Sequence, residues 1–458
     1  MNSSLAASLA LLLALAPGLR AADAPPPPPV DPARAILTLA GTGVSGATNG
    51  PGATATFHLP FFLAVAPDGH VFVSDLLNNA IRRITPAGEV STHTGFFPAG
   101  GSEDGPLATA KFKAPSGLAL DRAGNLYVAD RVSHAIRRIS ANGQVTTIAG
   151  LAGTPGSADG PREEARFNFP NGLAVDASGN IFVADTGNST IRRIDINGFV
   201  TTLAGSPGVE AAVNGPGGVA RFSIPFGLAL DTSGNLFVAD TGNDLIRRIT
   251  PAGVVSTVAG NQSHPPFADG TGDAARFDNP RGICVDAAGN LFVTDFGNAA
   301  LRRITPAGVV TTIAGAPRVR GSADGRGDQV RFDGPMGIAV DAAGNLYVCD
   351  AHNHKIRRSV FAPSFQSQPQ GLQLTAGTAA VLTANVASDV PATFQWRKNG
   401  LAVPGATTAT LSFASVQGAD AGVYTLVATN PAGSVTSQPA NLVVAVPAPV
   451  ITAQPASQ

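Results

Sequence analysis

The chain has 458 residues, of which 44% are apolar, 13% are charged and 53 are glycine. Lys and Arg (30) nearly balance Asp and Glu (31), so the chain lacks the basic excess that a nucleic-acid surface requires, and we expect no nucleic-acid partner. The length and glycine content are typical of a turn-rich globular chain of two or three domains.

The first 34 residues are typical of a leader and a spacer. Leu5 to Ala16 is an apolar run that contains only one Ser and is too short to span a bilayer. Small residues follow it at Ala21 and Ala22, which predicts a signal peptide at 1–21. Pro25 to Pro29 predict a stiff Pro-rich linker at 22–34. We therefore expect a secreted, periplasmic or cell-surface protein without an integral membrane segment.

Residues 35–360 contain one unit written six times. Its opening phenylalanine recurs every 55 residues, at Phe57, Phe112, Phe167, Phe222, Phe277 and Phe332. Each copy has four short apolar stretches, separated by turns rich in Gly, Asn and Asp, which favours a four-stranded antiparallel meander. One meander cannot bury both its faces, so the sequence predicts an all-β fold with a six-bladed β-propeller.

The sixth copy lacks its fourth stretch and ends near Ser359. The missing piece precedes the first copy, because Ala35 to Gly41 (AILTLAG) matches the fourth stretch of the second copy, Val145 to Gly150 (VTTIAG). We expect this N-terminal strand to close the last blade, which removes two open sheet edges.

The repeated phrases DTGN-x-x-IRRI and GLAVD-x-x-GN-LFVAD resemble NHL repeats, a family of six-bladed propellers named for an Asn-His-Leu run. The asparagine of that run is present at Asn78, Asn188, Asn243, Asn298 and Asn353. The histidine is present only at His134 and His354. The resemblance implies the propeller fold, but NHL propellers include both binding modules and a few enzymes.

Residues 361–446 have a different pattern, with short strands rich in Ser, Thr and Val. Trp396 on the third strand, and Tyr424 four residues after Asp420, resemble the buried Trp and tyrosine corner of an I-set-type immunoglobulin-like sandwich. The positions of the usual cysteines hold Ala384 and Leu426, so we expect no disulfide. Residues 447–458 resemble the start of a truncated second immunoglobulin-like domain, and we expect further such modules beyond them.

Each copy also carries an Arg pair on its third strand and an Asp at the end of its second strand. We expect one Arg of each pair to form an inter-blade ladder with the aspartates. The alternative is a basic binding ring, which the neutral net charge disfavours.

Candidate binding residues are the positions where the copies differ on the face around the central channel. The residue after each loop proline should lie near the channel mouth, and these positions include Phe61, Phe226, Arg281 and Met336, with Ser116 and Asn171. The loops between second and third strands add Leu76, Leu77, Asn79, Arg131, Val132, His134, Phe296, His352 and His354. Ordinary loop variation is one alternative, and a zinc site made by His134, His352 and His354 is another.

We expect a non-catalytic recognition or scaffold protein that binds an extracellular protein, peptide or glycan through this face. We name no catalytic residue, cofactor or metal ligand. The alternative is a metal-dependent propeller hydrolase or lyase, similar to the lactonase and amidating-lyase propellers, because the NHL family includes a few enzymes. Such enzymes hold a metal near the axis with carboxylate, Asn or His ligands from several blades, and the six channel-mouth positions do not supply such a set.

Overall fold

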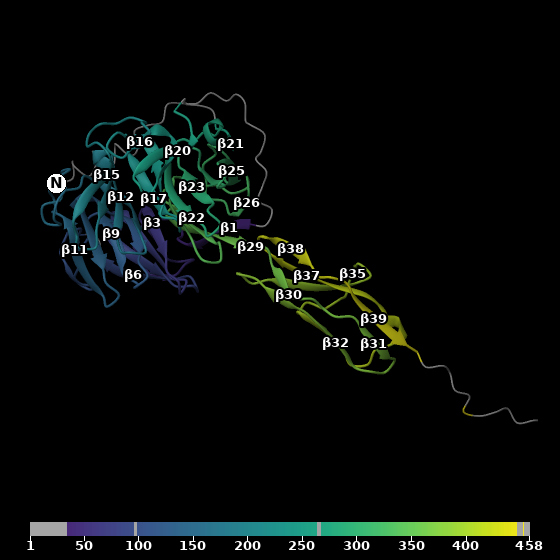
Figure 1. The fold of residues 1–458 in the computed structure, drawn as a ribbon. Helices are drawn as coiled ribbons and strands as arrows, with labels where there is room; N and C mark the ends of the chain where they lie inside the picture. Colours follow the sequence, from purple (N-terminus) through teal and green to yellow (C-terminus); the bar gives the residue numbers. More distant parts are fainter. Residues whose placement is uncertain (1–33, 96–98, 263–266, 447–451, 453–458) are drawn as a thin grey trace, which may run out of the picture.

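A computed structural model describes residues 34–95, 99–262, 267–446 and 452. The predicted signal peptide (1–21), residues 22–33 of the predicted linker and, apart from residue 452, the predicted second sandwich lie outside these ranges. The described chain forms a ring of sheets with an elongated sandwich beside it (Figure 1). Among the described residues, no helix is long and apolar enough to cross a membrane.

The ring consists of six antiparallel sheets and is the predicted six-bladed propeller. The first strands of neighbouring blades contact each other around the axis, and the later strands of each blade lie further out. From the inner to the outer edge, the strands are β3 (Pro60–Val65), β4 (Val71–Asp75), β5 (Ala80–Ile84) and β6 (Glu89–Gly95) in blade 1; β8 (Pro115–Leu120), β9 (Leu126–Asp130), β10 (Ala135–Ile139) and β11 (Gln144–Gly150) in blade 2; β12 (Pro170–Val175), β13 (Ile181–Asp185), β14 (Thr190–Ile194) and β15 (Val200–Gly205) in blade 3; β17 (Pro225–Leu230), β18 (Leu236–Asp240), β19 (Leu245–Ile249) and β20 (Val254–Gly260) in blade 4; β22 (Pro280–Val285), β23 (Leu291–Asp295), β24 (Ala300–Ile304) and β25 (Val309–Ala314) in blade 5; and β27 (Pro335–Val340), β28 (Leu346–Asp350), β29 (Lys355–Phe361) and β1 (Arg34–Ala40) in blade 6.

The loops that lead from one blade to the next add short strands at the outer edge. Each of these strands has two residues and pairs with the fourth strand of its blade. They are β2 (Gly50–Pro51), β7 (Gly105–Pro106), β16 (Gly215–Pro216), β21 (Gly270–Thr271) and β26 (Gly325–Arg326). The loop before β22 also contains the 3-10 turn η5 (Gly272–Ala274).

The N-terminal strand closes blade 6, as predicted. β1 lies between β26 and β29, with Ala35 opposite Val360 and Ile36 opposite Ser359. Ile36 is 2% exposed and packs in a core cluster with Phe292 of blade 5. The ring therefore depends on pairing the two ends of the propeller sequence.

The hydrophobic cores lie between neighbouring blades. In one of them, Ala174 and Ala184 of blade 3 pack with Val238 and Ile249 of blade 4. Around the axis the inner strands approach so closely that a Cβ on Gly172 would lie 2.2 Å from the carbonyl oxygen of Phe226. Only glycine fits such a contact, and the same close approach recurs at Gly117, Gly227 and Gly282.

The sandwich follows β29 directly. Its strands are β30 (Ser364–Ser367), β31 (Leu372–Thr375), β32 (Ala380–Thr383), β33 (Asn385–Ala387), β34 (Thr393–Lys398), β35 (Leu401–Ala402), β36 (Thr410–Phe413), β37 (Gly422–Asn430), β38 (Gly433–Thr436) and β39 (Ala440–Ala445), with the 3-10 turn η6 (Gly418–Asp420). Trp396 is fully buried, and the Tyr424 hydroxyl donates to the Asp420 carbonyl at 2.8 Å, which is the predicted tyrosine corner. Ala384 and Leu426 lie in the same core, where apolar packing replaces the usual disulfide.

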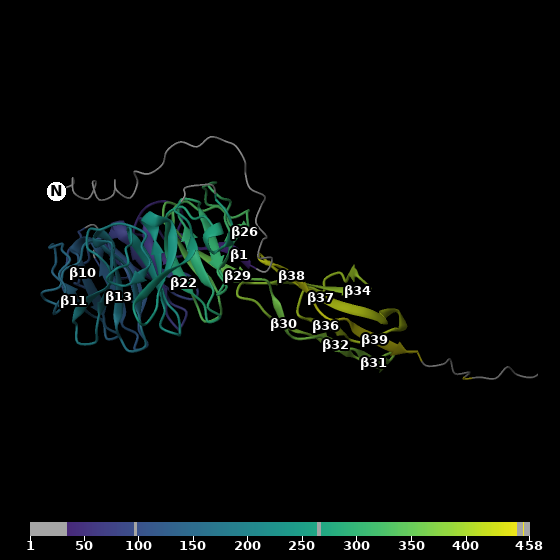
Figure 2. The same cartoon turned by 45° about the horizontal axis from the view of Figure 1, so that its top comes forward.

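The sandwich contacts blade 6 through the turn between β37 and β38 (Figure 2). Ala432 of this turn is buried with Ala35 and Val360, which are paired residues of β1 and β29. The Asn430 side-chain amide donates to the Phe361 carbonyl at 2.8 Å. Apolar packing and a hydrogen bond thus join the sandwich to the strand that closes the ring.

Candidate functional site

The candidate residues lie on the face formed by the loops between second and third strands, here called the loop face. In blades 1 to 4 each of these loops is a 3-10 turn: η1 (Leu76–Asn78), η2 (Arg131–Ser133), η3 (Thr186–Asn188) and η4 (Thr241–Asn243). Each turn starts after the buried Asp that ends the second strand. In blade 3, the Asp185 Oδ2 atom accepts from the Asn188 side chain at 2.7 Å and Oδ1 accepts from the Asn168 backbone at 2.7 Å. The aspartate therefore anchors both the turn and the incoming loop.

The Arg–Asp pairs lie within single blades, which corrects the predicted inter-blade ladder. Asp185 pairs with Thr190 across the hairpin, so Arg192, two residues further along β14, is its diagonal neighbour on the same face. Arg192 Nη1 donates to Asp185 Oδ2 at 2.8 Å, and Nη2 donates to Asp159 Oδ1 of the incoming loop at 2.6 Å. The Phe167 ring lies 5.2 Å from this guanidinium. The repeated Phe, Arg and Asp thus hold one blade to its own loop.

The residue after each turn links neighbouring blades. Asn79, His134, Ser189, Asp244, Ala299 and His354 all adopt the left-handed backbone conformation. The His134 Nδ1 atom accepts from the backbone N–H of Phe169 in blade 3 at 3.1 Å, and His354 Nδ1 accepts from Leu59 of blade 1 at 3.2 Å. Asn79 Oδ1 accepts from Ala114 of blade 2 at 2.9 Å. These three candidates therefore serve as inter-blade hydrogen-bond acceptors.

The three histidines of the zinc hypothesis have separate partners. His352 Nδ1 lies 3.1 Å from Asp333 Oδ1, and its ring contacts Phe296 edge to face. His134 and His354 are bound to different neighbouring blades as described above. Within 34–95, 99–262 and 267–446, no three His, Cys, Asp or Glu side chains gather in a way that could hold a metal ion.

Apolar candidates from several blades form one cluster at the axis. Phe61 and Leu76 of blade 1, Phe226 of blade 4 and Met336 of blade 6 are buried in it, while Leu77, Val132 and Phe296 are half-buried against it. The ring centroids of Phe61 and Phe226 lie 5.7 Å apart although blades 1 and 4 are opposite each other in the ring. Aromatic side chains therefore fill the axis at the level of the inner strands.

Sequence reasoning missed two aromatic residues that contact members of the candidate set. Phe62 stands where the other five copies have Gly, and its ring stacks on Phe226 at 5.7 Å. Comparing the copies at that position would have revealed it. Phe169 lies 5.0 Å from the Arg131 guanidinium and adopts a left-handed backbone conformation (φ 48°). A strained bulky residue of this kind has no sequence signal of its own.

Arg131 and Arg281 are the charged members of the candidate set, and both lie against aromatic rings. The Arg281 guanidinium lies 4.2 Å from the Phe296 ring and 4.9 Å from the Phe226 ring, and Arg281 is 7% exposed. Burial and, to a smaller extent, the charge of Arg131 lower the pKa of Arg281 to about 10. Burial also lowers the pKa of Arg131 to about 10.

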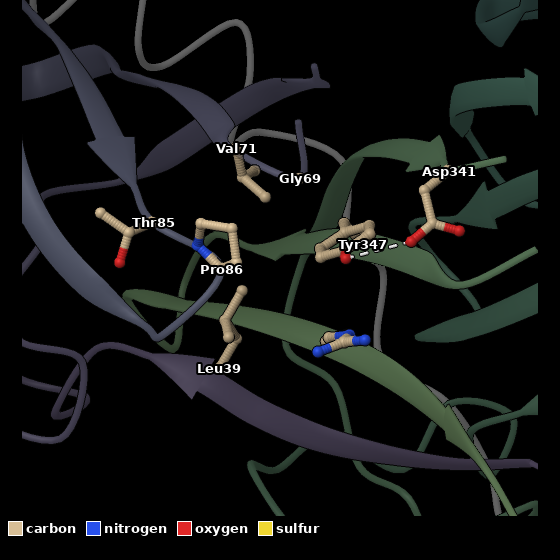
Figure 3. Close-up of a pocket in the computed structure, with 8 residues that line it drawn as sticks. Leu39, Gly69, Val71, Thr85, Pro86, Asp341 and Tyr347 are labelled. Carbon is tan, nitrogen blue, oxygen red and sulfur yellow. Dashed lines mark hydrogen bonds between the residues drawn. The ribbon is translucent and has the colours of Figure 1, made fainter. Parts of the chain in front are cut away.

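Two cavities lie away from these residues. One cavity of about 170 Å³ lies between blades 6 and 1 and is lined by Gly69, Pro86 and Tyr347, among others (Figure 3). A second, of about 280 Å³, occupies the corresponding place between blades 2 and 3, with Gly179, Ile196 and Tyr127 in its wall. Because the two have equivalent linings at the turns opposite the loop face, we attribute them to blade packing.

Comparisons with known proteins agree with this architecture. The NHL repeat model matches residues 167–194, 277–304 and 332–358, and the immunoglobulin domain model matches residues 362–430. The chain is 29% identical over 276 residues to Protein SUPPRESSOR OF QUENCHING 1, chloroplastic, of Arabidopsis thaliana, which covers 56% of this chain and 26% of that protein. It is 27% identical over 342 residues to NHL repeat-containing protein 2 of Bos taurus (67% of this chain, 46% of that protein) and 28% identical over 373 residues to Teneurin-1 of Mus musculus (70% and 13%). The chain thus spans less than half the length of these relatives.

Solved structures show the same fold at low identity. A Bacteroides thetaiotaomicron protein of unknown function superposes with a TM-score of 0.56 at 20% identity, covering 71% of this chain and 76% of that one. An auxiliary nutrient binding protein from the same organism superposes with a TM-score of 0.54 at 17% identity, covering 72% and 76%.

Proposed function

Because the chain carries NHL repeats and a C-terminal immunoglobulin domain, we propose that it is a non-catalytic recognition protein that binds a protein or peptide partner through the loop face. A binding or scaffold role fits an NHL propeller, since such propellers are protein-interaction modules. We further propose that it acts outside the cytoplasm, at the cell surface or after secretion, a location that rests on the leader expected at 1–21.

One observation carries the proposal. Apolar residues at several positions where the six copies differ come together on one face, around one apolar cluster. Leu77, Val132 and Phe296 come from blades 1, 2 and 5 and are all half-buried at its edge. A buried aromatic centre bordered by half-exposed apolar and cationic side chains is the composition of a protein-binding hot spot.

The sandwich has a role in display. Its contact with β1 and β29, through Asn430 and Ala432, holds it against blade 6 on the outer side of the ring. In this arrangement the sandwich projects sideways from the propeller (Figure 2), so we propose that it acts as a spacer that keeps the loop face accessible.

Selection of displayed peptides against the whole chain tests the proposal. Bound peptides should be lost with Leu77→Glu on the loop face and kept with Ile196→Glu, a matched control at an exposed turn (71% exposed) on the opposite side. Equal loss with both variants would refute the assignment of the face. If the chain binds glycans on an array and selects no peptide, the partner is a glycan and not a protein.

The hydrolase or lyase alternative has its own test, which is elemental analysis of the chain after dialysis without chelator. About one zinc or calcium per chain, lost together with lactone or ester hydrolysis in His354→Ala, would replace the binding proposal by the enzyme hypothesis.

A further inference from the structure

Two arginines lie near the otherwise apolar axis of the propeller, and neither belongs to the Arg pairs that recur on the third strands. Arg131 is the first residue of η2, where the other copies have Leu76, Thr186, Thr241, Phe296 and Ala351. Arg281 is the second residue of β22, where the other copies have Phe61, Ser116, Asn171, Phe226 and Met336. Blades 2 and 5 are opposite each other in the ring, so the two cations come from opposite sides of the axis.

Both arginines lie next to the same apolar cluster in the chain or in space. Arg281 contacts the rings of Phe226 and Phe296, which are members of the axial cluster, and Val132, the neighbour of Arg131, packs against that cluster as well. Arg131 lies over the Phe169 ring at 5.0 Å. The influence of the Arg131 charge on the Arg281 pKa agrees with this proximity.

Neither guanidinium has an anionic partner within the described part of the chain. The Nε atoms of Arg131 and Arg281 are buried without a hydrogen-bond partner, and no ion pair includes either residue. The nearby aspartates are already engaged, since Asp130 accepts from Arg137 and Asp295 accepts from Arg302. Arg281 is buried and Arg131 is half-buried, and neighbouring cations without a counter-charge are unfavourable. An anion from outside would therefore offset a cost already present in the fold.

We propose that Arg131 and Arg281 form an anion site at the centre of the loop face and that this site binds a carboxylate. The aromatic rings cover the faces of the guanidinium groups, which leaves their N–H edges for an acceptor. The planar fork of an arginine matches the two oxygens of a carboxylate. The apolar surroundings favour a carboxylate on a carbon frame over the more strongly hydrated phosphate.

The site deepens the proposed function and rests on it, because it names the group that the loop face recognises. The carboxylate is either an acidic side chain of a partner peptide or a small free dicarboxylate. Half-buried Leu77, Val132 and Phe296 then contact the carbon atoms next to it.

Calorimetric titration of the full chain at constant ionic strength tests the site. The probes are succinate, the capped peptide Ac-Gly-Phe-Glu-Gly-NH2, its Gln counterpart and inorganic phosphate. We expect succinate or the Glu peptide to bind one site per chain, with affinity at least about 10-fold lower in Arg281→Met and Arg131→Met, because each removes one charge-assisted bidentate contact. Arg122→Met, at an exposed turn of blade 2, is the control and should leave the affinity unchanged.

Thermal unfolding of the unliganded proteins supplies a second readout. Because Arg281 is buried without a counter-charge, Arg281→Met should unfold at a temperature no lower than that of the wild type. If Arg281→Met does not fold, Arg131→Met and Arg281→Lys carry the test; the latter keeps the charge but loses the fork and should weaken binding.

The outcomes separate the sources and the hypotheses. Binding of succinate alone identifies a free dicarboxylate, and binding of the Glu peptide but not its Gln counterpart identifies an acidic partner. The carboxylate site is overturned by any of three results: neither carboxylate probe binds, the arginine variants bind as tightly as the wild type, or phosphate binds more tightly than the carboxylates. If selected peptides are lost with Leu77→Glu yet bind Arg281→Met as tightly as wild type, the proposed function stands and the anion site fails.

Discussion

Replacing Arg192 by Met tests how much the repeated Arg–Asp pair contributes to stability. Arg192 and Asp185 are both fully buried, and Nη1 of the arginine donates to the carboxylate at 2.8 Å. The guanidinium also donates to the carbonyls of Ala158 at 2.8 Å and Arg166 at 2.9 Å and to the carboxylate of Asp159 at 2.6 Å. Methionine fills most of the arginine stem but supplies no charge, so Asp185 loses the one cationic partner that it has in the described part of the chain.

The magnitude follows from the fate of Asp185. Burial already raises its pKa to about 6 against the opposing charge of Arg192. Without Arg192 the carboxyl must either stay charged in an apolar interior or take up a proton, and proton uptake at pH 7, one unit above the wild-type pKa of about 6, costs about 1.4 kcal/mol. The loss of the charge-assisted hydrogen bonds to Asp185, Asp159 and the Ala158 carbonyl adds to this cost. We therefore expect Arg192→Met to lower the free energy of unfolding by about 3 to 5 kcal/mol at pH 7. The loss should shrink by about 1.4 kcal/mol between pH 7 and pH 6 and stay level at lower pH, where the wild-type Asp185 also takes up a proton.

Differential scanning calorimetry measures the change. For a propeller of about 330 residues, an unfolding entropy of roughly 2.1 cal/mol/K per residue converts this loss into a Tm decrease of about 4 to 7 °C. The matched control is Arg193→Met, because Arg193 is the exposed neighbour on the same strand and should change stability by less than about 0.5 kcal/mol. Equal effects of the two substitutions, or an additive double variant with Asp185→Asn, would refute the reasoning.

Two further substitutions test the inter-blade acceptor and the closing strand. Burial and neighbouring cations lower the pKa of His134 from 6.5 to about 4. The stability of the folded protein is therefore full above pH 6.5 and falls toward pH 4, because the unfolded chain binds the proton first. His134→Asn keeps a hydrogen-bond acceptor, as Asn79 does, and should lose about 2 to 3 kcal/mol less of its unfolding free energy over that pH range in urea titrations followed by circular dichroism. An equal acid loss in both proteins would contradict this. Ile36→Asp should lower the unfolding free energy of the propeller by more than about 3 kcal/mol, so the propeller unfolds at a lower urea concentration. The fluorescence of Trp396, the only tryptophan, should remain native at that concentration, because it reports on the sandwich. An unchanged propeller transition would count against closure by β1.

The fold could be predicted because its information is local and repeated. Turn residues and short apolar stretches indicate the meander, and the match between residues 35–41 and 145–150 indicates the closing strand. The Arg–Asp partners were assigned wrongly because alternation along a strand gives a side but not a partner. The hairpin register, with Asp185 opposite Thr190, places Arg192 diagonally within the same blade.

The candidate site was less accessible to sequence reasoning. His134 accepts a hydrogen bond from a residue 35 positions later, and that contact needs left-handed backbone on both sides of the blade boundary. No local pattern encodes such a pairing. The positions where the copies differ did identify the apolar cluster, because several apolar departures from the repeat on this face line one common axis.

The position of β1 also bears on how the protein is made. Arg34–Ala40 is synthesised before any blade, yet its partner strand β29 ends at Phe361, about 330 residues later. At roughly 5 to 20 residues per second, this apolar strand waits about 15 to 65 seconds on the ribosome without its native neighbours. The nascent chain therefore carries this strand without its β29 partner until the propeller sequence is complete. A chaperone that covers the strand would prevent it from pairing with the same strand of a chain growing on a neighbouring ribosome.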